Sequence, residues 1–353
     1  MRLDDREWGT FYIGDMFIVK RPAARNKDDY VEGTVPFVAS GSVNNGVLKC
    51  CEPHAEERLD EAGCITVSPV DGSAFYQPYD FLGRGGAGSS VLMLYKKGIN
   101  LYSGQFIARM IAQTCSVKYN YGHMGNKDNI KRERIMLPVT EDGEPDYQFM
   151  EDYTRELMER KRKQYRTYAE KRLAELSILS ENMRGGWSLL LKIHEWKPFY
   201  VVDIFPENER GKRLKKADHK PGKVPYASST AENNGIDGFI EATPGTRVFD
   251  DCISLANSGS VGSAFYEPFA FVASDHVTHL KREGLTKWQY LFLTCAIEKQ
   301  GSNFNFNREI NDARLGKMQI MLPVTEDGEP DYDFMELFGK SLMRSKYEQY
   351  LAY

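Results

Sequence analysis

The feature of this sequence that most restricts its fold is an internal repeat. The thirteen residues IMLPVTEDGEPDY occur at 135–147 and again at 320–332. The match extends to 135–150 and 320–335, which are identical at fifteen of sixteen positions. A long repeat within one chain indicates copies of one structural unit. Each copy has enough residues for its own hydrophobic core, so we predict two copies of one domain.

Shorter blocks recur in the same order on both sides of this stretch. Named by their first residues, the matching pairs are EWGTFYIGDMF at Glu7 and EWKPFYVVDIF at Glu195, VPFVASGSVNNG at Val35 and VPYASSTAENNG at Val224, GSAFYQPYDF at Gly72 and GSAFYEPFAF at Gly262, and KYNYG at Lys118 and NFNFN at Asn303. The segments between the blocks differ. A shared framework with different loops favours two different recognition surfaces, although drift in unconstrained loops would leave the same pattern.

The composition is that of a globular protein, with 41% hydrophobic and 27% charged residues. No stretch approaches eighteen consecutive apolar residues and the N-terminal residues have no apolar segment, so we expect a cytoplasmic protein with no membrane partner. The six cysteines form no CxxC pair, and His276 and His279 have no further ligands nearby, so we predict no metal site. The net charge of −4 disfavours nucleic acid unless basic residues are concentrated locally.

Each copy reads as an α+β domain. Short runs of aromatic and β-branched residues are separated by Gly, Asn, Pro and Ser, which is typical of strands with tight turns. Both copies carry Asn-Asn-Gly, at 44–46 and 233–235, which predicts a hairpin turn with positive φ. Apolar residues at helical spacing predict a helix from Ser103 and another from Lys287. We therefore predict a twisted mixed sheet with small helices in each copy.

The stretch repeated letter for letter precedes a predicted helix in both copies. Prolines and a glycine break the backbone, and Asp146 or Asp331 then stands at the N-cap position. The first helix is predicted from Tyr147 to Met183 and the second from Tyr332. The predicted organisation is a first domain at 1–146, a central spacer helix at 147–186, a second domain at 187–330 and a C-terminal spacer helix at 331–353. Two equal joints favour antiparallel spacer helices and a pseudo-twofold axis.

Catalytic patterns are missing from the sequence. There is no GxSxG, Walker loop, HExxH or deaminase pattern, and no Asn/Asp-Pro-Pro-Tyr/Phe of an adenine methyltransferase. The glycine-rich GRGGAG at 83–88 lacks the context of a dinucleotide site and is better read as a loop. Pro145-Asp146 with Glu159 and Lys161 imitates a nuclease motif, but the second copy lacks the later part. We therefore predict no catalytic, cofactor-binding or metal-binding residues in this chain.

Binding signals are stronger than catalytic ones. Two cationic segments, KRPAARNK at 20–27 and RGKRLKKADHKPGK at 210–223, occur at equivalent places and are suited to phosphates. Serines, threonine and asparagines follow them, with side chains suited to base edges. The candidate DNA-binding residues are Lys20, Arg21, Arg25, Lys27, Ser40, Ser42, Asn44, Asn45, Arg84, Lys118, Tyr119, Tyr121, Lys127, Arg210, Lys212, Arg213, Lys215, Lys216, Ser228, Ser229, Thr230, Asn233, Asn234, Asn305 and Arg308.

The duplicated domain, the VP[FY] strand, the KYNYG-like segment, the I.LPV close and the helix that follows together resemble the specificity subunits of type I restriction–modification systems. The resemblance covers essentially the whole chain and is greatest to the compact specificity subunits of type IIB and related systems. It implies two target recognition domains, each reading one half of a bipartite DNA site, with the helices fixing the distance between the halves.

The resemblance also implies partners and cofactors. The chain would be a non-catalytic subunit that binds double-stranded DNA and docks methyltransferase or fused nuclease–methyltransferase subunits. Those subunits would use S-adenosylmethionine and Mg²⁺, and this chain would hold no cofactor. The residues of the central helix that a partner would cover are Leu157, Tyr165, Tyr168, Leu173 and Leu176.

Three alternatives stay open. The chain could be a standalone two-headed DNA-binding or decoy protein without a methyltransferase partner. It could be a nuclease or methyltransferase in its own right. Tandem sugar- or protein-binding modules are a third alternative, which the paired cationic loops disfavour.

Overall fold

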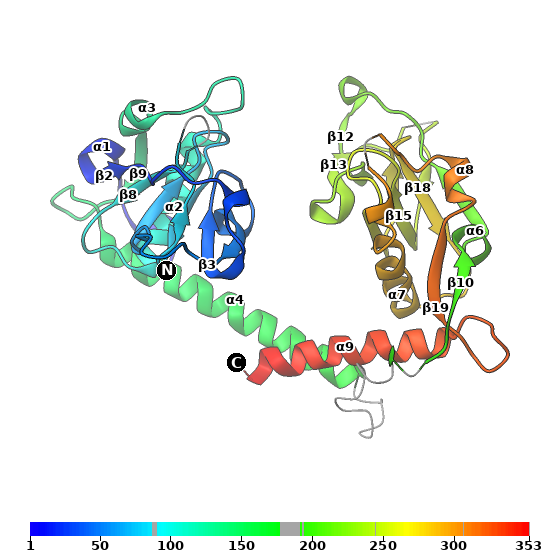
Figure 1. Cartoon of the computed structure of the whole chain (residues 1–353). Coiled ribbons are helices and arrows are strands. Elements are labelled where there is room, and N and C mark those ends of the chain that lie inside the picture. Colours follow the sequence, from blue (N-terminus) through cyan, green and yellow to red (C-terminus); the bar gives the residue numbers. More distant parts are fainter. Residues whose placement is uncertain (87–89, 177–190, 193, 244, 306, 353) are drawn as a thin grey trace. The chain divides into compact units, whose positions relative to one another are not determined.

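The structure is a computed structural model, and it divides into two compact units, Met1–Tyr165 (unit 1) and Arg166–Tyr353 (unit 2) (Figure 1). It describes residues 1–86, 90–176, 191–192, 194–243, 245–305 and 307–352.

Unit 1 contains three small sheets. Its strands are β1 (Trp8–Tyr12), β2 (Ile18–Lys20), β3 (Glu32–Val38), β4 (Val47–Cys51), β5 (Cys64–Val67), β6 (Ala74–Gln77), β7 (Leu82–Gly83), β8 (Leu92–Tyr95) and β9 (Arg134–Pro138). β1 pairs antiparallel with β9, and the other two sheets have the orders β2-β8-β5-β6 and β4-β3-β7. Because β3 and β7 are parallel while the other pairs are antiparallel, the sheets are mixed as predicted.

Unit 2 repeats this arrangement. Its strands are β10 (Trp196–Tyr200), β11 (Glu207–Arg210), β12 (Pro221–Ala227), β13 (Ile236–Ile240), β14 (Val248–Phe249), β15 (Cys252–Ala256), β16 (Ala264–Glu267), β17 (Phe271–Ala273), β18 (Val277–Lys281) and β19 (Gln319–Pro323). β10 pairs with β19, and the sheet orders are β11-β18-β15-β16 and β13-β12-β17-β14. Strand β14 is an addition, since unit 1 has a single bridge from Asp60 to Phe81 at that place. The predicted duplication of an α+β domain is confirmed.

Helices follow the same correspondence. The α-helices are α1 (Ile13–Met16), α2 (Leu101–Cys115), α3 (Lys127–Lys131) and α4 (Tyr147–Leu176), followed by α6 (Val201–Ile204), α7 (Lys287–Glu298), α8 (Asp312–Leu315) and α9 (Tyr332–Ala352). Single 3₁₀ turns occur at η1 (Leu3–Asp5), η2 (Lys27–Asp29), η3 (Asn44–Gly46), η5 (Lys216–Asp218), η6 (Asn233–Gly235) and η7 (Gly301–Asn303).

The main core of each unit lies between one helix and the larger sheet. In unit 1, Ile107 and Ile111 of α2 are fully buried in the same cluster as Ile65 of β5. In unit 2, Leu293 and Ile297 of α7 are buried in a cluster with residues of β15 and β19. The predicted helices from Ser103 and Lys287 are thus α2 and α7, placed by apolar residues at helical spacing.

The repeated Asn-Asn-Gly segments form the predicted turns. They connect the antiparallel pairs β3–β4 and β12–β13. Asn45 and Asn234 have φ of 58° and 54°, and Gly46 and Gly235 both have φ of 76°. Asparagine and glycine adopt this left-handed conformation at least cost, which explains their occurrence in both units.

The stretch repeated letter for letter forms the joint between a strand and a helix, which we call the hinge (residues 138–147 and 323–332). In unit 1, Asp146 N donates to Pro138 O and Thr140 N to Glu144 O, both at 2.9 Å, and the equivalent two bonds in unit 2 have the same length. Gly143 and Gly328 turn the chain with φ of 79° and 82°. The hinge therefore ties the start of each long helix to the strand before it.

Both long helices start at the predicted N-caps. Phe149 N donates to Asp146 Oδ1 and Phe334 N to Asp331 Oδ1, each at 2.9 Å. Helix α4 is described to Leu176, and the predicted continuation to Met183 lies outside the described residues. Within unit 2, the last turns of α4 pack against α9, which runs in the opposite direction (Figure 1).

Candidate nucleic-acid interface

In unit 1, backbone and side-chain hydrogen bonds bring together the loops that carry the candidate residues. Ala24, in the cationic loop after β2, forms a bridge with Gly85 of the glycine-rich loop. Ser73 Oγ donates to Gly41 O at 2.8 Å, and Gly125 N donates to Pro69 O at 2.7 Å. We call residues 20–27, 39–46, 68–73, 83–86 and 118–127 the unit-1 loop cluster. Five segments distant in sequence thus form one surface region.

Arg21 lines a cavity in this cluster. The cavity has a volume of about 190 Å³, and its lining residues are Arg21, Pro69, Gly86, Ser90, Leu92, Gly125 and Asn126. It combines one exposed cation with the hydroxyl group of Ser90 and the side-chain amide of Asn126, which come from two other loops. Such a combination suits a phosphate together with polar groups beside it.

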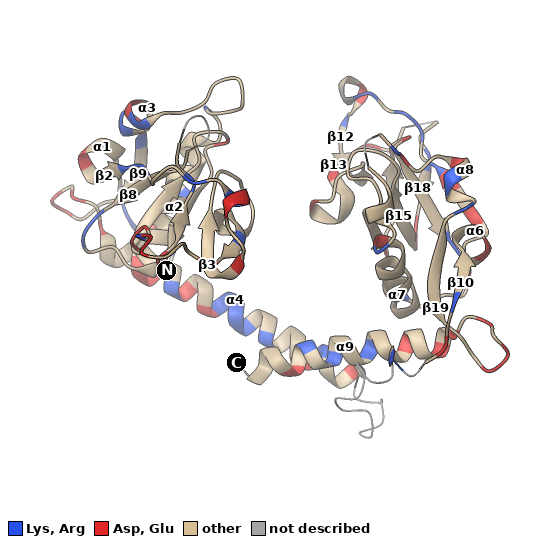
Figure 2. Cartoon of the chain, in the orientation of Figure 1, with Lys and Arg blue, Asp and Glu red and all other residues tan. Residues whose placement is uncertain are grey.

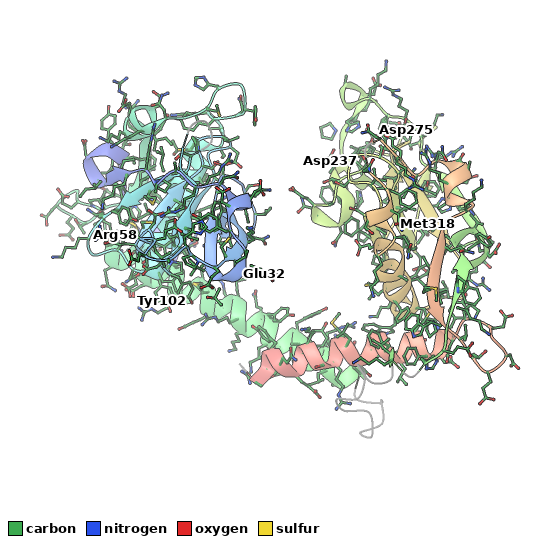
Figure 3. All side chains as sticks on the ribbon, in the orientation of Figure 1. Glu32, Arg58, Tyr102, Asp237, Asp275 and Met318 are labelled. Atoms are coloured by element: carbon green, nitrogen blue, oxygen red, sulfur yellow. The ribbon has the colours of Figure 1, made fainter. Side chains whose placement is uncertain are left out.

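Unit 2 brings the corresponding loops together. Lys212 N donates to Ala273 O at 3.1 Å, and Ser260 N donates to Ser229 O at 2.9 Å. The segment around Asn257 joins two further loops, because Asn257 N donates to His276 O at 2.8 Å and Ile310 N donates to Asn257 O at 2.9 Å. We call residues 210–215, 228–235, 257–262, 273–276, 303–305 and 307–310 the unit-2 loop cluster; Asp275, in this cluster, is labelled in Figure 3.

Most of the candidate residues have exposed side chains. The exposed ones are Lys20, Arg21, Lys27, Ser42, Asn44, Asn45, Lys118, Tyr121, Lys212, Arg213, Lys215, Asn233, Asn234, Asn305 and Arg308. The partly exposed ones are Ser40, Arg84, Lys127, Arg210, Ser228, Ser229 and Thr230. The side chain of Lys216 lies outside the described part of the chain. Arg25 and Tyr119 are buried, for separate reasons.

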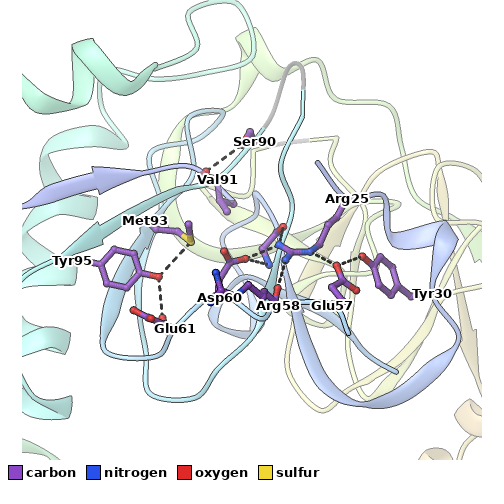
Figure 4. Close-up of polar contacts among 11 residues, drawn as sticks. Arg25, Tyr30, Glu57, Arg58, Asp60, Glu61, Ser90, Val91, Met93 and Tyr95 are labelled. Atoms are coloured by element: carbon purple, nitrogen blue, oxygen red, sulfur yellow. Dashed lines mark hydrogen bonds and ion pairs between the residues drawn. The ribbon is translucent and has the colours of Figure 1, made fainter. Parts of the chain in front are cut away.

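Arg25 is held inside unit 1 by two carboxylates (Figure 4). Its guanidinium donates to Glu57 and Asp60, both at 2.7 Å, and to the carbonyl oxygens of Gly83 and Arg58. Burial by itself raises the pKa of Glu57, because it opposes ionisation of the carboxyl group. The hydrogen bonds from Arg25 and Tyr30 outweigh burial, so the pKa of Glu57 is lowered overall. Arg25 therefore fastens the cationic loop to the domain and is not available to a phosphate.

Tyr119 also faces inward. Its hydroxyl donates to Glu133 Oε1 at 2.7 Å, and burial followed by this bond raises the pKa of Tyr119. Lys118 forms an ion pair with the same carboxylate while keeping an exposed side chain. Tyr121, two residues on, is 85% exposed. Of the two aromatic candidates in this segment, Tyr121 is the one with an exposed side chain.

Several of the exposed and partly exposed candidates have partners within their own unit. Asn45 Nδ2 donates to Tyr76 O at 3.2 Å, and Arg210 Nε donates to Asp312 Oδ1 at 2.8 Å. Lys20 lies over the ring of Tyr95. These contacts orient the side chains at the edge of each cluster.

The structure adds residues that the sequence did not single out. Ser258 Oγ lies 2.6 Å from His276 Nδ1, and the imidazole is more than half exposed within the unit-2 loop cluster. Asp275 lies beside the same ring, with Oδ1 4.0 Å from His276 Nε2. The sequence signal here was the HxxH pair of His276 and His279, for which we predicted no metal site. His279 Nδ1 lies 2.9 Å from the backbone oxygen of Glu209.

The candidate partner-binding residues divide along α4. Leu176 is buried and Leu173 half-buried in a cluster with Trp288 and Tyr347, and the ring of Tyr168 meets Tyr347 edge-on. Leu157 is half-buried and Tyr165 is exposed. Figure 2 shows both signs of charge along this helix, with acidic residues toward its start and a run of cations, Arg160, Lys161, Arg162, Lys163 and Arg166, further along.

Neither a metal centre nor a membrane span stands out in the described residues. No three His, Cys, Asp or Glu side chains among them could hold a metal ion. None of the described helices is long and apolar enough to cross a membrane.

Comparisons with known proteins agree with the duplicated architecture. Residues 5–165 and 193–350 each match the family described as the type I restriction modification DNA specificity domain. A curated relative is the specificity subunit S.BcgI of a type II restriction enzyme from Heyndrickxia coagulans, which is 27% identical over 339 residues, 94% of this chain and 93% of the relative.

Similar solved structures include the S subunit of a type I restriction–modification system from M. genitalium, at 16% identity and a TM-score of 0.46, covering 99% of this chain and 93% of that one. Another is the HsdS subunit from Thermoanaerobacter tengcongensis, at 13% identity and a TM-score of 0.32, covering 98% and 95%. The matched family is the DNA-binding component of restriction–modification systems and assembles with their other subunits. With one copy of the domain in each unit, the chain belongs to the family of type I restriction modification DNA specificity domains, and it is a non-catalytic specificity subunit of a restriction–modification system.

Proposed function

We propose that each unit reads one half of a bipartite DNA sequence through its loop cluster. The observation that carries this proposal is that two equal frameworks hold loops of different length and sequence. The segment between β7 and β8 spans residues 84–91, whereas its counterpart between β17 and β18 is only 274–276. Equal frameworks would dock on the duplex in equal ways, while different loops would meet different bases.

The polar composition of the clusters supports this role. Exposed lysines and arginines of the loops after β2 and β11 would neutralise phosphates. Serine, threonine and asparagine side chains beside them, together with His276, would donate to and accept from base edges. With a net charge of −4, the chain would need further phosphate contacts from the rest of the complex.

The partners in this proposal are methyltransferase or fused nuclease–methyltransferase subunits docked on helices α4 and α9. The half-buried and exposed apolar side chains of Leu157, Tyr165 and Tyr168 would lie under such a partner. S-adenosylmethionine and Mg²⁺ would be held by the partner, which acts on DNA in the cytoplasm. The name of the curated relative, a specificity subunit of a type II restriction enzyme, supports a partner that carries the restriction activity.

Co-purification and methylation mapping test the proposal together. The chain is expressed with the products of its neighbouring genes, and methylated adenines are mapped in the host genome with and without this gene. We expect a large methyltransferase to co-purify, and a two-part methylated sequence to disappear on deletion. Absence of both would overturn the proposal in favour of a standalone two-headed DNA-binding protein.

A further inference from the structure

Gln77 and Glu267 occupy the same position in the two units. Gln77 ends β6 and pairs with Cys64 of β5, and Glu267 ends β16 and pairs with Cys252 of β15. Both side chains are buried, with 4% and 1% exposure. Both lie on the face of the sheet that packs against the Asn-Asn-Gly turn, since η3 contacts β6 and η6 contacts β16. At this buried position beneath the Asn-Asn-Gly turn, unit 1 thus has an amide and unit 2 a titratable carboxyl group.

In unit 1 the amide of Gln77 anchors this turn. Its Nε2 donates to the backbone oxygen of Asn45 at 3.0 Å and to Thr66 Oγ1 at 2.9 Å. Asn45 Nδ2 lies 3.3 Å from Gln77 Oε1 and completes a two-way contact. The left-handed conformation of Asn45 is thereby held from below. The amide is suited to this task because it donates and accepts at once.

In unit 2 an ionised carboxylate could not make the same contact. Ser254 Oγ, the equivalent of Thr66 Oγ1, donates to Glu267 Oε1 at 3.0 Å. Among the described residues, this is the hydrogen bond that the carboxyl group accepts, and Asn234 donates none to it, whereas Asn45 donates to Gln77. A carboxylate has no donor for the backbone oxygen of Asn234, whereas the neutral acid has one.

The groups around Glu267 favour the neutral form. On β15 the facing group is the Cys252 thiol, and on β18 the ammonium of Lys281 is paired with Asp250 at 2.8 Å. His279 of β18 lies on the same face, and its burial lowers its pKa and keeps it neutral. The turn itself presents amides. Burial raises the pKa of Glu267 to about 7, while the bond from Ser254 lowers it in part.

We propose that Glu267 is a positioning residue that holds the Asn233–Asn234–Gly235 turn as the neutral acid, its O–H donating to the backbone oxygen of Asn234. The bond is the counterpart of the one from Gln77 to Asn45. Deprotonation removes the donor and places a negative charge beneath the turn, so the turn of unit 2 loosens as pH rises while that of unit 1 does not. This inference rests on the proposed DNA-reading role of the turn only for its effect on affinity.

The first test follows the stability of the chain with pH and uses no DNA. Thermal denaturation is recorded from about pH 5 to about pH 9 for the wild type and Glu267→Gln. As pH rises and Glu267 ionises, we expect the Tm of the wild type to fall more than the Tm of Glu267→Gln, which has no carboxyl group to ionise at this position. Parallel Tm curves for the two proteins would overturn the proposal. The histidines are present in both proteins, so their titration affects both Tm curves equally and does not contribute to the difference between the curves.

The second test follows DNA affinity in the assembled complex. We expect affinity for the methylated target sequence to fall about tenfold between about pH 7 and about pH 8.5 beyond the fall seen with Glu267→Gln. The matched variant Gln77→Glu should bring the same pH dependence to unit 1, in Tm and in affinity. Failure of all proteins to bind DNA, with the Tm difference intact, would overturn the proposed function and leave the anchoring role standing. An unchanged Tm in Gln77→Glu would contradict the anchoring role itself.

Discussion

At the scale of single residues, Arg25 of unit 1 and Glu267 of unit 2 show opposite solutions to burying an ionisable group. Arg25 is ionised and surrounded by two carboxylates and two carbonyl oxygens. Among the described residues, Glu267 accepts a hydrogen bond from the Ser254 hydroxyl and is paired with no cation. A buried charge is tolerable when it is paired and hydrogen-bonded, and an unpaired acid takes up a proton instead.

Replacing Arg25 should destabilise unit 1 strongly. Arg25→Ala leaves Glu57 and Asp60 without their cation, and removing one partner of a buried ion pair costs about 3–5 kcal/mol. Denaturant unfolding measures the loss. Lys27→Ala is the matched control, because this nearby side chain is exposed and its removal should change the free energy of unfolding by less than about 0.5 kcal/mol. Equal effects of the two variants would contradict the structural role of Arg25.

The pH dependence of Glu267 has a definite sign. Its folded pKa of about 7 lies above the ordinary value of 4.5, so the unfolded chain releases this proton first as pH rises. The free energy of unfolding therefore falls as pH rises from the ordinary pKa of Glu267 to its folded pKa. The fall is complete above the folded pKa and amounts to a total on the order of 3 kcal/mol. Glu267→Gln should be more stable than the wild type by a similar amount near pH 8, as measured by denaturant unfolding. A variant that is less stable at that pH would show that ionised Glu267 is well accommodated.

At the scale of elements, local signals were enough to predict the turns, the helices and the hinge. Asn-Asn-Gly, the N-cap aspartates and the helical spacing of apolar residues each act within a few residues of chain. The convergence of the loops depended on sheet order, in which β7 lies beside β3 and β8 lies between β2 and β5, and no local pattern contains that order. The burial of Arg25 escaped prediction for the same reason, because its partners lie 32 and 35 residues further along.

Replacing either hinge aspartate should lower the free energy of unfolding by the same amount. Asp146→Ala and Asp331→Ala each remove a helix cap with the same 2.9 Å bond, so each should cost about 1 kcal/mol in the free energy of unfolding of its own unit. Denaturation of each variant measures the cost. Asparagine keeps the accepting oxygen, and Asp146→Asn and Asp331→Asn should therefore recover most of the loss. If asparagine recovered nothing, the side-chain contacts of the two aspartates with Arg6 and His194 would account for the loss instead.

At the scale of the whole molecule, phosphate contacts and base contacts should contribute to DNA binding in ways that experiments can distinguish. Lys212→Ala with Arg213→Ala should weaken DNA binding by the assembled complex and reduce the slope of log affinity against log salt by about 2, since each phosphate contact contributes about 0.9. Binding titrations at several salt concentrations give the slope. Lys197→Ala, an exposed cation of β10 beside the unit-2 hinge, is the control and should leave the slope unchanged.

The two units should also be separable in what they recognise. Ser42→Ala with Asn44→Ala in unit 1 should relax one half of the methylated sequence, and Thr230→Ala with Asn233→Ala in unit 2 should relax the other half. Loss of a good base contact is worth about 1–3 kcal/mol of discrimination. Genome-wide methylation mapping of each variant gives the result. If either pair of substitutions altered both halves, the units would not read DNA independently.

The identical sequence of the two hinges bears on how accurately the angle between strand and helix must be set. Helix α4 has 30 residues and is therefore about 45 Å long, at 1.5 Å per residue. A deviation of about 5° at its root displaces its far end by about 4 Å, which exceeds the 3.4 Å between successive base pairs. In most surface segments, a change of a few degrees in backbone direction has no effect on function. If α4 fixes the distance between the two half-sites, as the resemblance implies, the joint at its start cannot tolerate such a change, because an error of a few degrees there would change that distance by about one base pair.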